Sequence, residues 1–274
     1  MIAPAAPALS VQATPGPSVE VYFATLHVDA DTITVFRTAD GVTEAVAGAE
    51  RASVSGDFVV IDSQVPFGVV SSYVGRIFDA SGASLDGPPA TITVNSDDVW
   101  FQSQLDPSTA VAVELMEQTF SSVSRKRRTE RIYVAGVRRP FEQNWGMGGI
   151  EGLPFNVMSR GDDAAIGLEV LLGYSPLLIR TPPRLTTLPR ALSASITNPI
   201  HEPLDWANAN NENAIVWTLT VDEVQPASKA VVRPLVTWDD WTTAFPAADF
   251  TWDDVMTVYG AGTWTDAIRN PPNA

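Results

Sequence analysis

The 274-residue sequence contains no cysteine, which excludes disulfide scaffolds, cysteine-ligated zinc, iron–sulfur clusters and cysteine nucleophiles. It contains only two histidines, His27 and His201, which leaves little material for a histidine-rich metal site or a catalytic triad. No run approaches the roughly 18 apolar residues of a membrane helix, so we expect no membrane span. These absences predict a protein without metal or cofactor.

Basic residues are also scarce, since 17 Lys and Arg face 32 Asp and Glu, for a net charge of −15. A nucleic-acid-binding protein is expected to present a basic surface, so this balance argues against a nucleic-acid partner. The hydrophobic fraction of 45%, with eight Trp and eleven Phe, is sufficient for buried cores and excludes global disorder. A chain of this length is expected to form two domains.

The bases are concentrated in one segment. Residues 1–98 carry 12 acids against 3 bases, residues 99–232 carry 14 against 12, and residues 233–274 carry 6 against 2. Seven of the 17 bases are Arg125, Lys126, Arg127, Arg128, Arg131, Arg138 and Arg139. The segment is either a solvated β-hairpin whose bases oppose edge-to-edge pairing, or an electrostatic contact with an acidic neighbour such as another copy. No aromatic interleaving accompanies it, which disfavours a nucleic-acid contact.

Turn residues and short apolar runs divide the first part of the chain. Residues 1–18 are rich in Pro and Ala, and we predict an extended arm that is ordered only against a partner. Residues 19–96 contain short strand-like runs at a spacing of about ten residues, which is typical of a β-sandwich. The expected strands are 19–23, 32–37, 58–62, 73–78 and 90–94.

A second, mainly β domain is expected over residues 99–232, after a polar break at 95–98. Its expected strands are 110–115, 131–137, 176–180 and 214–221. One helix is expected over 162–172, with Asp162 or Asp163 as the N-cap and Gly173 at the C′ position. The chain is therefore predicted to be mainly β, with two β-sandwich-type domains and a single helix in the second.

The segment 233–274 repeats a Thr-Trp-x-Asp unit at 237–240, 251–254 and 263–266. Thr followed three residues later by an acid resembles a capping box, so we predict three short capped helices. Such helices are too short to be stable alone, and Trp238, Trp241, Trp252 and Trp264 need a surface on this chain or a neighbour's. A choline- or glycan-binding repeat is the alternative, but those repeats are hairpins rich in Gly and Lys.

No catalytic constellation is recognisable. The segment GMGGIEG at 146–152 lacks the residues of a phosphate-binding loop, and we predict a flexible loop with tight turns. The acid pairs Asp29/Asp31 and Asp162/Asp163 lack the further oxygen ligands of a calcium loop, which favours turn and cap roles. The sequence therefore predicts a protein that is not an enzyme.

The first domain resembles a fibronectin type III module, and more narrowly those of minor tail proteins of long-tailed actinobacterial phages. DSQVPFGVVSSY at 62–73 is similar to their D-x-x-x-P-x-G-x-x-x-x-Y stretch, and the strand that follows to Gly82 is similar to the Y-x-x-R-V-x-A-x-x-x-G strand of fibronectin modules. The second domain resembles the one that follows such modules. Its matching segments are VWFQSQLDPS at 99–108, LLIRTPP at 177–183 and VWTLTVDEV at 216–224.

This resemblance implies a structural virion protein of the tail tip or baseplate, similar to distal-tail proteins. It would form a symmetric homo-oligomer, contact other phage tail-tip proteins, contribute to tail assembly and host attachment, and reside in the virion after synthesis in the host cytoplasm. The seven clustered bases and the four C-terminal tryptophans are then the expected subunit contacts. One alternative is a tail-tip module that binds host cell-surface glycan through Trp145. A second is an accessory component of a cell-wall glycan hydrolase.

Overall fold

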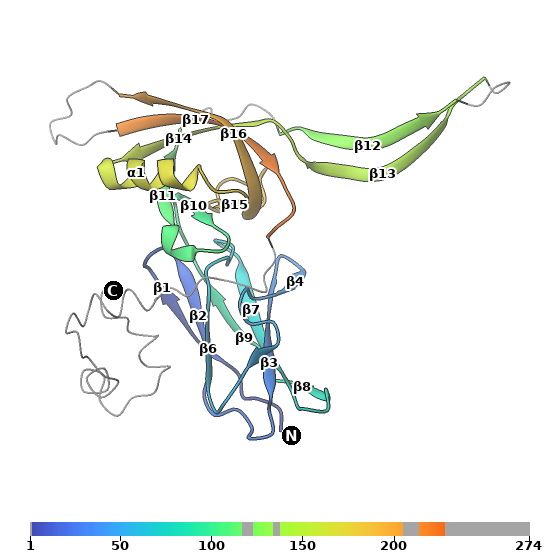
Figure 1. Ribbon diagram of the computed structural model, residues 1–274, viewed down its shortest axis with the longest axis vertical. Helices are drawn as coiled ribbons and strands as arrows, with labels where there is room; N and C mark the ends of the chain where they lie inside the picture. Colours follow the sequence, from blue (N-terminus) through green and yellow to red (C-terminus); the bar gives the residue numbers. More distant parts are fainter. Residues whose placement is uncertain (1, 117–122, 134–137, 205–213, 228–274) are drawn as a thin grey trace. The chain divides into compact units, whose positions relative to one another are not determined.

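The computed structural model describes residues 2–116, 123–133, 138–204 and 214–227. The chain divides into two compact units. Unit 1 contains residues 2–96 with the short segment Leu105–Ser108, and unit 2 contains Asp97–Gln104 with Thr109–Ala227. The tryptophan repeats of 233–274 lie outside the described residues. The prediction of a mainly β chain with one helix in the second domain is confirmed over the described part of the chain (Figure 1).

Unit 1 consists of two antiparallel sheets that pack face to face. One sheet has the order β1 (Ala8–Gln12), β2 (Ser18–Phe23), β6 (Phe58–Asp62). The other has the order β4 (Val42–Ala45), β3 (Thr32–Ala39), β7 (Val70–Phe78), β8 (Ser84–Asp86), with β5 (Ala52–Ser53) beside β3 and β9 (Ala90–Thr93) beside β7. The sheets approach closely at Gly75, where a Cβ would lie 2.5 Å from the Phe23 ring. The two sheets form a β-sandwich.

The N-terminal segment differs from the arm predicted for residues 1–18. Ala8–Gln12 form strand β1, which pairs in antiparallel register with β2 from Ala8 opposite Tyr22 to Gln12 opposite Ser18. Within the segment, Ala8–Gln12 pair with a strand of unit 1 and not with a second molecule. Proline is tolerated in the segments that flank an edge strand, which is why a Pro-rich stretch can contain one.

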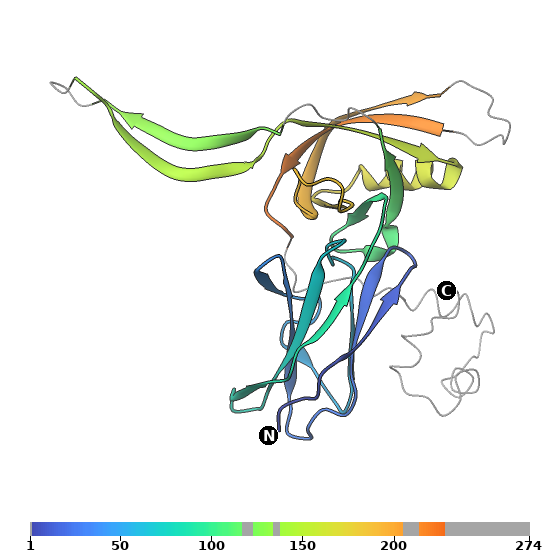
Figure 2. The same ribbon diagram turned by 180° about the vertical axis from the view of Figure 1, so that it is seen from behind.

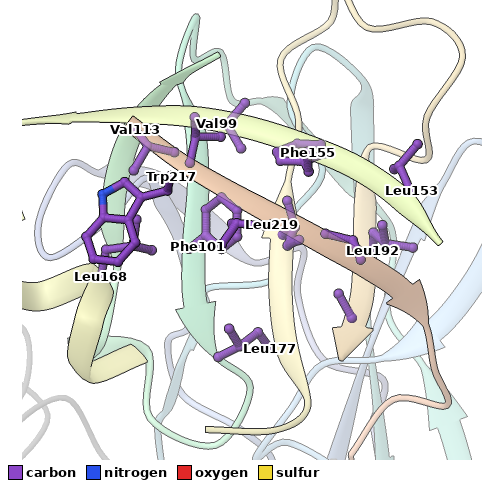
Figure 3. Packing of buried hydrophobic residues seen from close by; sticks show 14 of the residues in the cluster. Val99, Phe101, Val113, Leu153, Phe155, Leu168, Leu177, Leu192, Trp217 and Leu219 are labelled. Atoms are coloured by element: carbon purple, nitrogen blue, oxygen red, sulfur yellow. The ribbon is translucent and has the colours of Figure 1, made fainter. Parts of the chain in front are cut away.

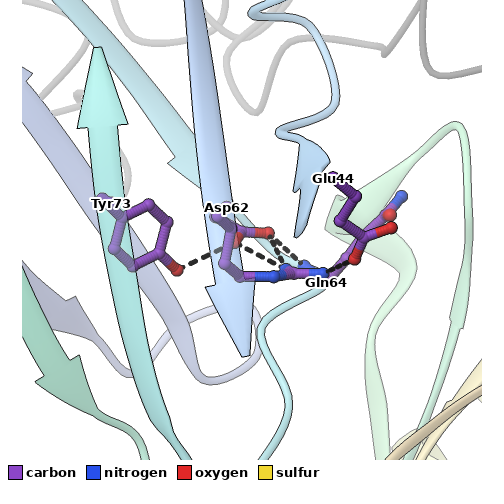
Figure 4. A network of polar contacts seen from close by, with 5 residues as sticks. Glu44, Asp62, Gln64 and Tyr73 are labelled. Atoms are coloured by element: carbon purple, nitrogen blue, oxygen red, sulfur yellow. Dashed lines mark hydrogen bonds and ion pairs between the residues drawn. The ribbon is translucent and has the colours of Figure 1, made fainter. Parts of the chain in front are cut away.

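A buried polar network joins the two sheets of unit 1 (Figure 4). Arg37 of β3 donates from Nη1 to both carboxylate oxygens of Asp62 in β6, at 2.9 and 2.6 Å, and pairs through Nη2 with Glu44. The Tyr73 hydroxyl donates to Asp62 Oδ2 at 2.8 Å, and the Gln64 N–H donates to Asp62 Oδ1 at 2.9 Å. The first and last residues of the 62–73 motif are therefore hydrogen-bonded partners in the core.

Burial and charge act together on this network. Burial alone would lower the pKa of Arg37. The negative charges of Asp62 and Glu44 have the larger combined effect, so the pKa of Arg37 is raised. Burial and the Asp62 charge both raise the pKa of the Tyr73 phenol, which keeps it protonated as a hydrogen-bond donor. The motif thus supplies two of the hydrogen-bond donors to its buried carboxylate, Gln64 and Tyr73, and β3 supplies Arg37.

Unit 2 is a closed antiparallel barrel. Its strand order is β10 (Val99–Ser103), β11 (Val111–Leu115), β14 (Leu153–Arg160), β17 (Ala214–Glu223), β16 (Ala191–Pro203), β15 (Leu177–Arg180). A short 3₁₀ helix, Pro107–Thr109, separates β10 from β11. Closure into a barrel removes the edges of the sheet. The sequence predicted a β domain with sandwich-type packing and did not indicate that the sheet closes.

Inward-facing side chains of the barrel form one core (Figure 3). Phe101 and Phe155 pack edge to face with ring centroids 6.0 Å apart. Trp217 is buried in the same core, and its indole Nε1 donates to Ser159 Oγ at 2.9 Å. Alternation along β14 and β17 directs Phe155 and Trp217 inward, in the period-2 pattern of a half-buried strand, whereas all four residues of β15 are buried.

Helix α1 (Asp162–Leu171) packs its buried residues Ala165, Leu168 and Leu171 onto unit 2. The N-cap is Gly161, at φ 80°, and no side chain caps the helix. The prediction of Asp162 or Asp163 as N-cap is therefore wrong. Both residues lie in the first turn, where the helix dipole favours acids. Gly173 follows the C-cap residue Leu172 as expected, although its φ is not in the left-handed region. No helix among the described residues is long and apolar enough to cross a membrane.

Candidate functional site

The predicted basic segment forms one strand of a long hairpin. Strand β12 (Arg125–Ile132) pairs with β13 (Phe141–Ile150) as a separate two-stranded sheet (Figure 1). Every side chain of β12 is exposed, and so is every residue of β13 up to Met147. The expected strand 131–137 overlaps β12 at its first two residues, and 134–137 lie outside the described residues. Both faces of this hairpin are open to solvent.

The glycine-rich segment 146–152 is not the flexible loop that the sequence predicted. Gly146, Gly148 and Gly149 belong to β13, and the register slips twice along it. Arg127 faces Met147 and Thr129 faces Asn144, so β13 holds one extra residue there, and a second between Met147 and Ile150. Glycine permits such bulges because it adopts positive φ, here 90° at Gly146, and lets backbones approach.

The base of the hairpin is attached to the barrel. Ile150 is buried in the barrel core, and its N–H donates to Glu223 Oε2 of β17 at 2.8 Å. The N–H of Gly152 donates to Asp222 Oδ1 at 2.7 Å. Lys126 pairs with Glu151, and this hydrogen bond raises the pKa of the lysine. The hairpin therefore projects from a fixed base.

We expect Glu223→Ala to loosen this base. The substitution leaves the buried Ile150 N–H without its acceptor, which costs about 1–3 kcal/mol. Amide exchange at Ile150 should accelerate by about tenfold or more, as measured by NMR hydrogen exchange. Glu202→Ala, an exposed position on β16, is the matched control and should leave that rate unchanged. Equal rates in both variants would contradict the assigned anchor.

The described part of the hairpin contains all seven predicted bases. Its acids are Glu130 and Glu142, so residues 125–150 carry seven bases against two acids, a net charge of +5. Arg131 Nε lies 3.5 Å from Glu142 Oε2. Among the described residues, neither Arg127 nor Arg128 has an ion-pair partner. The hairpin is thus a positive projection on a protein of strongly negative net charge.

The outer part of the hairpin also exposes large apolar side chains, which sequence reasoning missed except for Trp145. They are 44% to 76% exposed: Ile132, Tyr133, Phe141, Trp145 and Met147. Ile132 and Phe141 are direct cross-strand partners, so their side chains share one face of the hairpin. Trp145 lies on β13 and not in a loop. Bases and apolar groups side by side are typical of a docking surface rather than of a solvated edge.

The other predicted residues do not gather into a site. His27 accepts a hydrogen bond from the Asp29 N–H at 3.2 Å in unit 1, while His201 lies on β16 with its ring 5.2 Å from that of Trp217. Among the described residues, no group of three or more His, Asp or Glu side chains could hold a metal ion. Trp238, Trp241, Trp252 and Trp264 lie outside the described residues.

Comparison with known proteins gives no family. No family model matches the chain, and no curated protein matches its sequence. The basic and apolar β12–β13 hairpin is therefore the candidate functional site on the geometry of this chain alone.

Proposed function

We propose that this protein is a structural subunit that assembles with further copies of itself through the β12–β13 hairpin, as part of the tail tip of a long-tailed phage. The observation that carries the proposal is a hairpin exposed on both faces, with a net charge of +5 and five exposed large apolar side chains.

The low intrinsic stability expected of a two-stranded hairpin supports docking against another molecule. An isolated two-stranded hairpin is only marginally stable in water, because it has no third element against which to bury a face. This hairpin has a fixed base at Ile150, while its outer residues, Phe141 and Trp145 among them, contact solvent. Burying these side chains against another molecule removes apolar area from water and orders the outer strands.

Electrostatics favours another copy as the partner. The whole chain carries −15, and unit 1 contributes most of the excess acid. A positive projection on a negative molecule is attracted to the surface of a second molecule, which raises the rate of encounter and orients it. The same field repels nucleic acid from most of the protein.

The placement in a phage tail rests on the motifs at 62–73, 99–108, 177–183 and 216–224. In support, the two ends of the 62–73 motif are hydrogen-bonded to each other within a buried network of a sandwich unit, and that unit precedes a β unit with one helix. This is the order that the resemblance implies. The proposal therefore includes other tail-tip proteins as partners and the virion as the location.

A glycan-binding role for the same hairpin is the second candidate. Trp145 is 55% exposed, and an exposed indole ring can stack on a sugar. A Trp145→Ala virion that adsorbs to host cells as the unaltered virion does would exclude this residue as a receptor contact.

The proposed assembly is tested by reversing charge at Arg127 and Arg128, both exposed and without an ion-pair partner among the described residues. We expect R127E/R128E to remain folded but to reduce self-association by at least tenfold, as measured by sedimentation velocity, because like charges then meet at the contact. The triple variant R184E/T186E/T187E makes the same change in net charge on an exposed loop and should associate normally. Normal assembly of R127E/R128E would exclude the hairpin as the contact.

A further inference from the structure

Helix α1 has an outer face that none of the described residues of unit 2 covers. Ile166 and Val170 are one helical turn apart on the side opposite the core residues, and Tyr174 follows just past the helix end. These three side chains are 48% to 60% exposed. An amphipathic helix is expected to direct polar residues outward, so this apolar stripe contradicts the usual pattern.

Acidic side chains flank the stripe. Asp163 and Glu169 are exposed on the same side of α1, and the helix contains no basic residue. The two acids lie three residues before Ile166 and three residues after it, so they border the stripe at neighbouring turns. We name Asp163, Ile166, Glu169, Val170 and Tyr174 the α1 face.

Most of the exposed large apolar side chains in the described part of unit 2 lie at two sites. Nine large apolar side chains are exposed among its described residues; five lie in the hairpin, three on the α1 face, and the ninth is Ile200. One place is basic and the other acidic. Surface apolar groups are normally scattered singly, so two opposite-charged clusters point to surfaces that fit each other.

We propose that the α1 face of one copy receives the β12–β13 hairpin of the next. This inference rests on the proposed self-assembly and names its acceptor surface. The apolar side chains of the hairpin pack on Ile166, Val170 and Tyr174, while its arginines meet Asp163 and Glu169. Both surfaces lie in unit 2, so every copy offers one of each.

The contact must form between copies. The hairpin leaves the barrel beside the Glu223 end of β17, whereas α1 packs against β10, β11 and β14. Figures 1 and 2 show the outer hairpin and α1 on opposite sides of the barrel. A hairpin that points away from its own α1 makes a head-to-tail contact with a second copy.

The C-terminal segment 233–274 fits the α1 face less well. Its four tryptophans could cover an apolar stripe, but it carries 6 acids against 2 bases, the same sign as the α1 face. Juxtaposed like charges oppose binding, whereas the hairpin brings a net charge of +5. Charge therefore selects the hairpin as the occupant.

A charge exchange tests the pairing on full-length protein. R127E/R128E makes the hairpin less basic, and D163K/E169K makes the α1 face basic. Each variant alone should associate at least tenfold more weakly than the wild-type protein. An equimolar mixture should regain association, because the unaltered basic hairpin of D163K/E169K then meets the unaltered acidic α1 face of R127E/R128E, while the two substituted surfaces bring glutamates to lysines. I166S/V170S removes two of the three apolar side chains of the stripe without changing charge, and it should also weaken association at least tenfold.

The outcomes separate this inference from the proposed function. If R127E/R128E blocks association while D163K/E169K and I166S/V170S associate normally, the hairpin is the contact but the α1 face is not its acceptor. A mixture that stays dissociated also overturns the pairing. If wild-type protein is monomeric at every concentration tested by sedimentation, the proposed assembly itself fails.

A photo-crosslinking amino acid at Val170 identifies the occupant directly. The expected product is an intermolecular crosslink to a peptide within 125–150, identified by mass spectrometry. A crosslink to 233–274 instead would assign the α1 face to the C-terminal segment and overturn the proposal. The same crosslinker at Glu202, an exposed position on β16, is the control and should give no product with 125–150.

Discussion

Replacing Asp62 with alanine is expected to destabilise unit 1 by about 3–5 kcal/mol, the cost of removing the buried carboxylate from a buried arginine that then keeps only the half-buried Glu44. Asp62 and Arg37 are 1% and 5% exposed, and the carboxylate also holds the Tyr73 hydroxyl and the Gln64 N–H. Since domains of this size are stable by only about 5–15 kcal/mol, the loss removes much of the stability of the sandwich.

All eight tryptophans lie outside residues 1–96, so unfolding of the sandwich is best measured by hydrogen exchange of β2 and β6 amides. The control is Asp86→Ala, which breaks an exposed pair in which Arg76 Nε lies 2.5 Å from Asp86 Oδ1. Exposed pairs contribute less than about 1 kcal/mol, so exchange should change little. If Asp62→Ala and Asp86→Ala lost similar protection from hydrogen exchange, the result would contradict the importance assigned to burial of the pair.

A double replacement separates the missing partner from the missing contacts. Arg37→Met together with Asp62→Leu removes both charges and keeps apolar volume, so it should recover part of the stability that Asp62→Ala loses. If the double variant is no more stable than Asp62→Ala alone, the cost does not come from an arginine that has lost its buried carboxylate.

Trp217→Ala is expected to destabilise the barrel by about 3–5 kcal/mol, because it opens a cavity in a core that closes around the indole. The side chain packs among the buried residues of the barrel core (Figure 3) and is 3% exposed. Its loss also leaves Ser159 Oγ without the indole donor. Urea unfolding followed by far-UV circular dichroism measures the change.

The matched control is Trp145→Ala, the same substitution on the exposed hairpin. It should change the stability of the isolated protein by less than about 1 kcal/mol, because surface substitutions create no cavity. Equal destabilisation by the two variants would mean that Trp145 is packed in solution, which contradicts a free hairpin.

Much of the fold follows from local patterns. The short runs at 32–37 and 73–78 predicted strands, which the structure extends to Thr32–Ala39 and Val70–Phe78, and the pattern of 162–172 predicted the helix. Barrel closure could not be predicted in this way. It depends on pairs such as Trp100 with Arg180, which are distant in sequence and share no local signal.

The candidate site was predicted only in part. The cluster of bases can be counted from the sequence. The place of Gly146–Gly149 in a strand cannot, because it depends on pairing with β12, which overrides the turn preference of glycine. The α1 face was missed because a helix pattern shows which residues are apolar, not which of them the core leaves uncovered. Ile166 lies next to Ala165 in sequence, and only the packing of Ala165 shows that Ile166 faces outward.

The two bulges of β13 have a consequence for symmetry. In a head-to-tail assembly, the rotation from one copy to the next depends on the angle between the surface that is offered and the surface that receives it. Bulges bend a strand, and at Gly148 a Cβ would lie 2.9 Å from the Lys126 carbonyl oxygen, so a side chain there would change the bend. The glycines of β13 would then decide how many copies close a ring, or whether the chain of copies stays open, without contacting a neighbour.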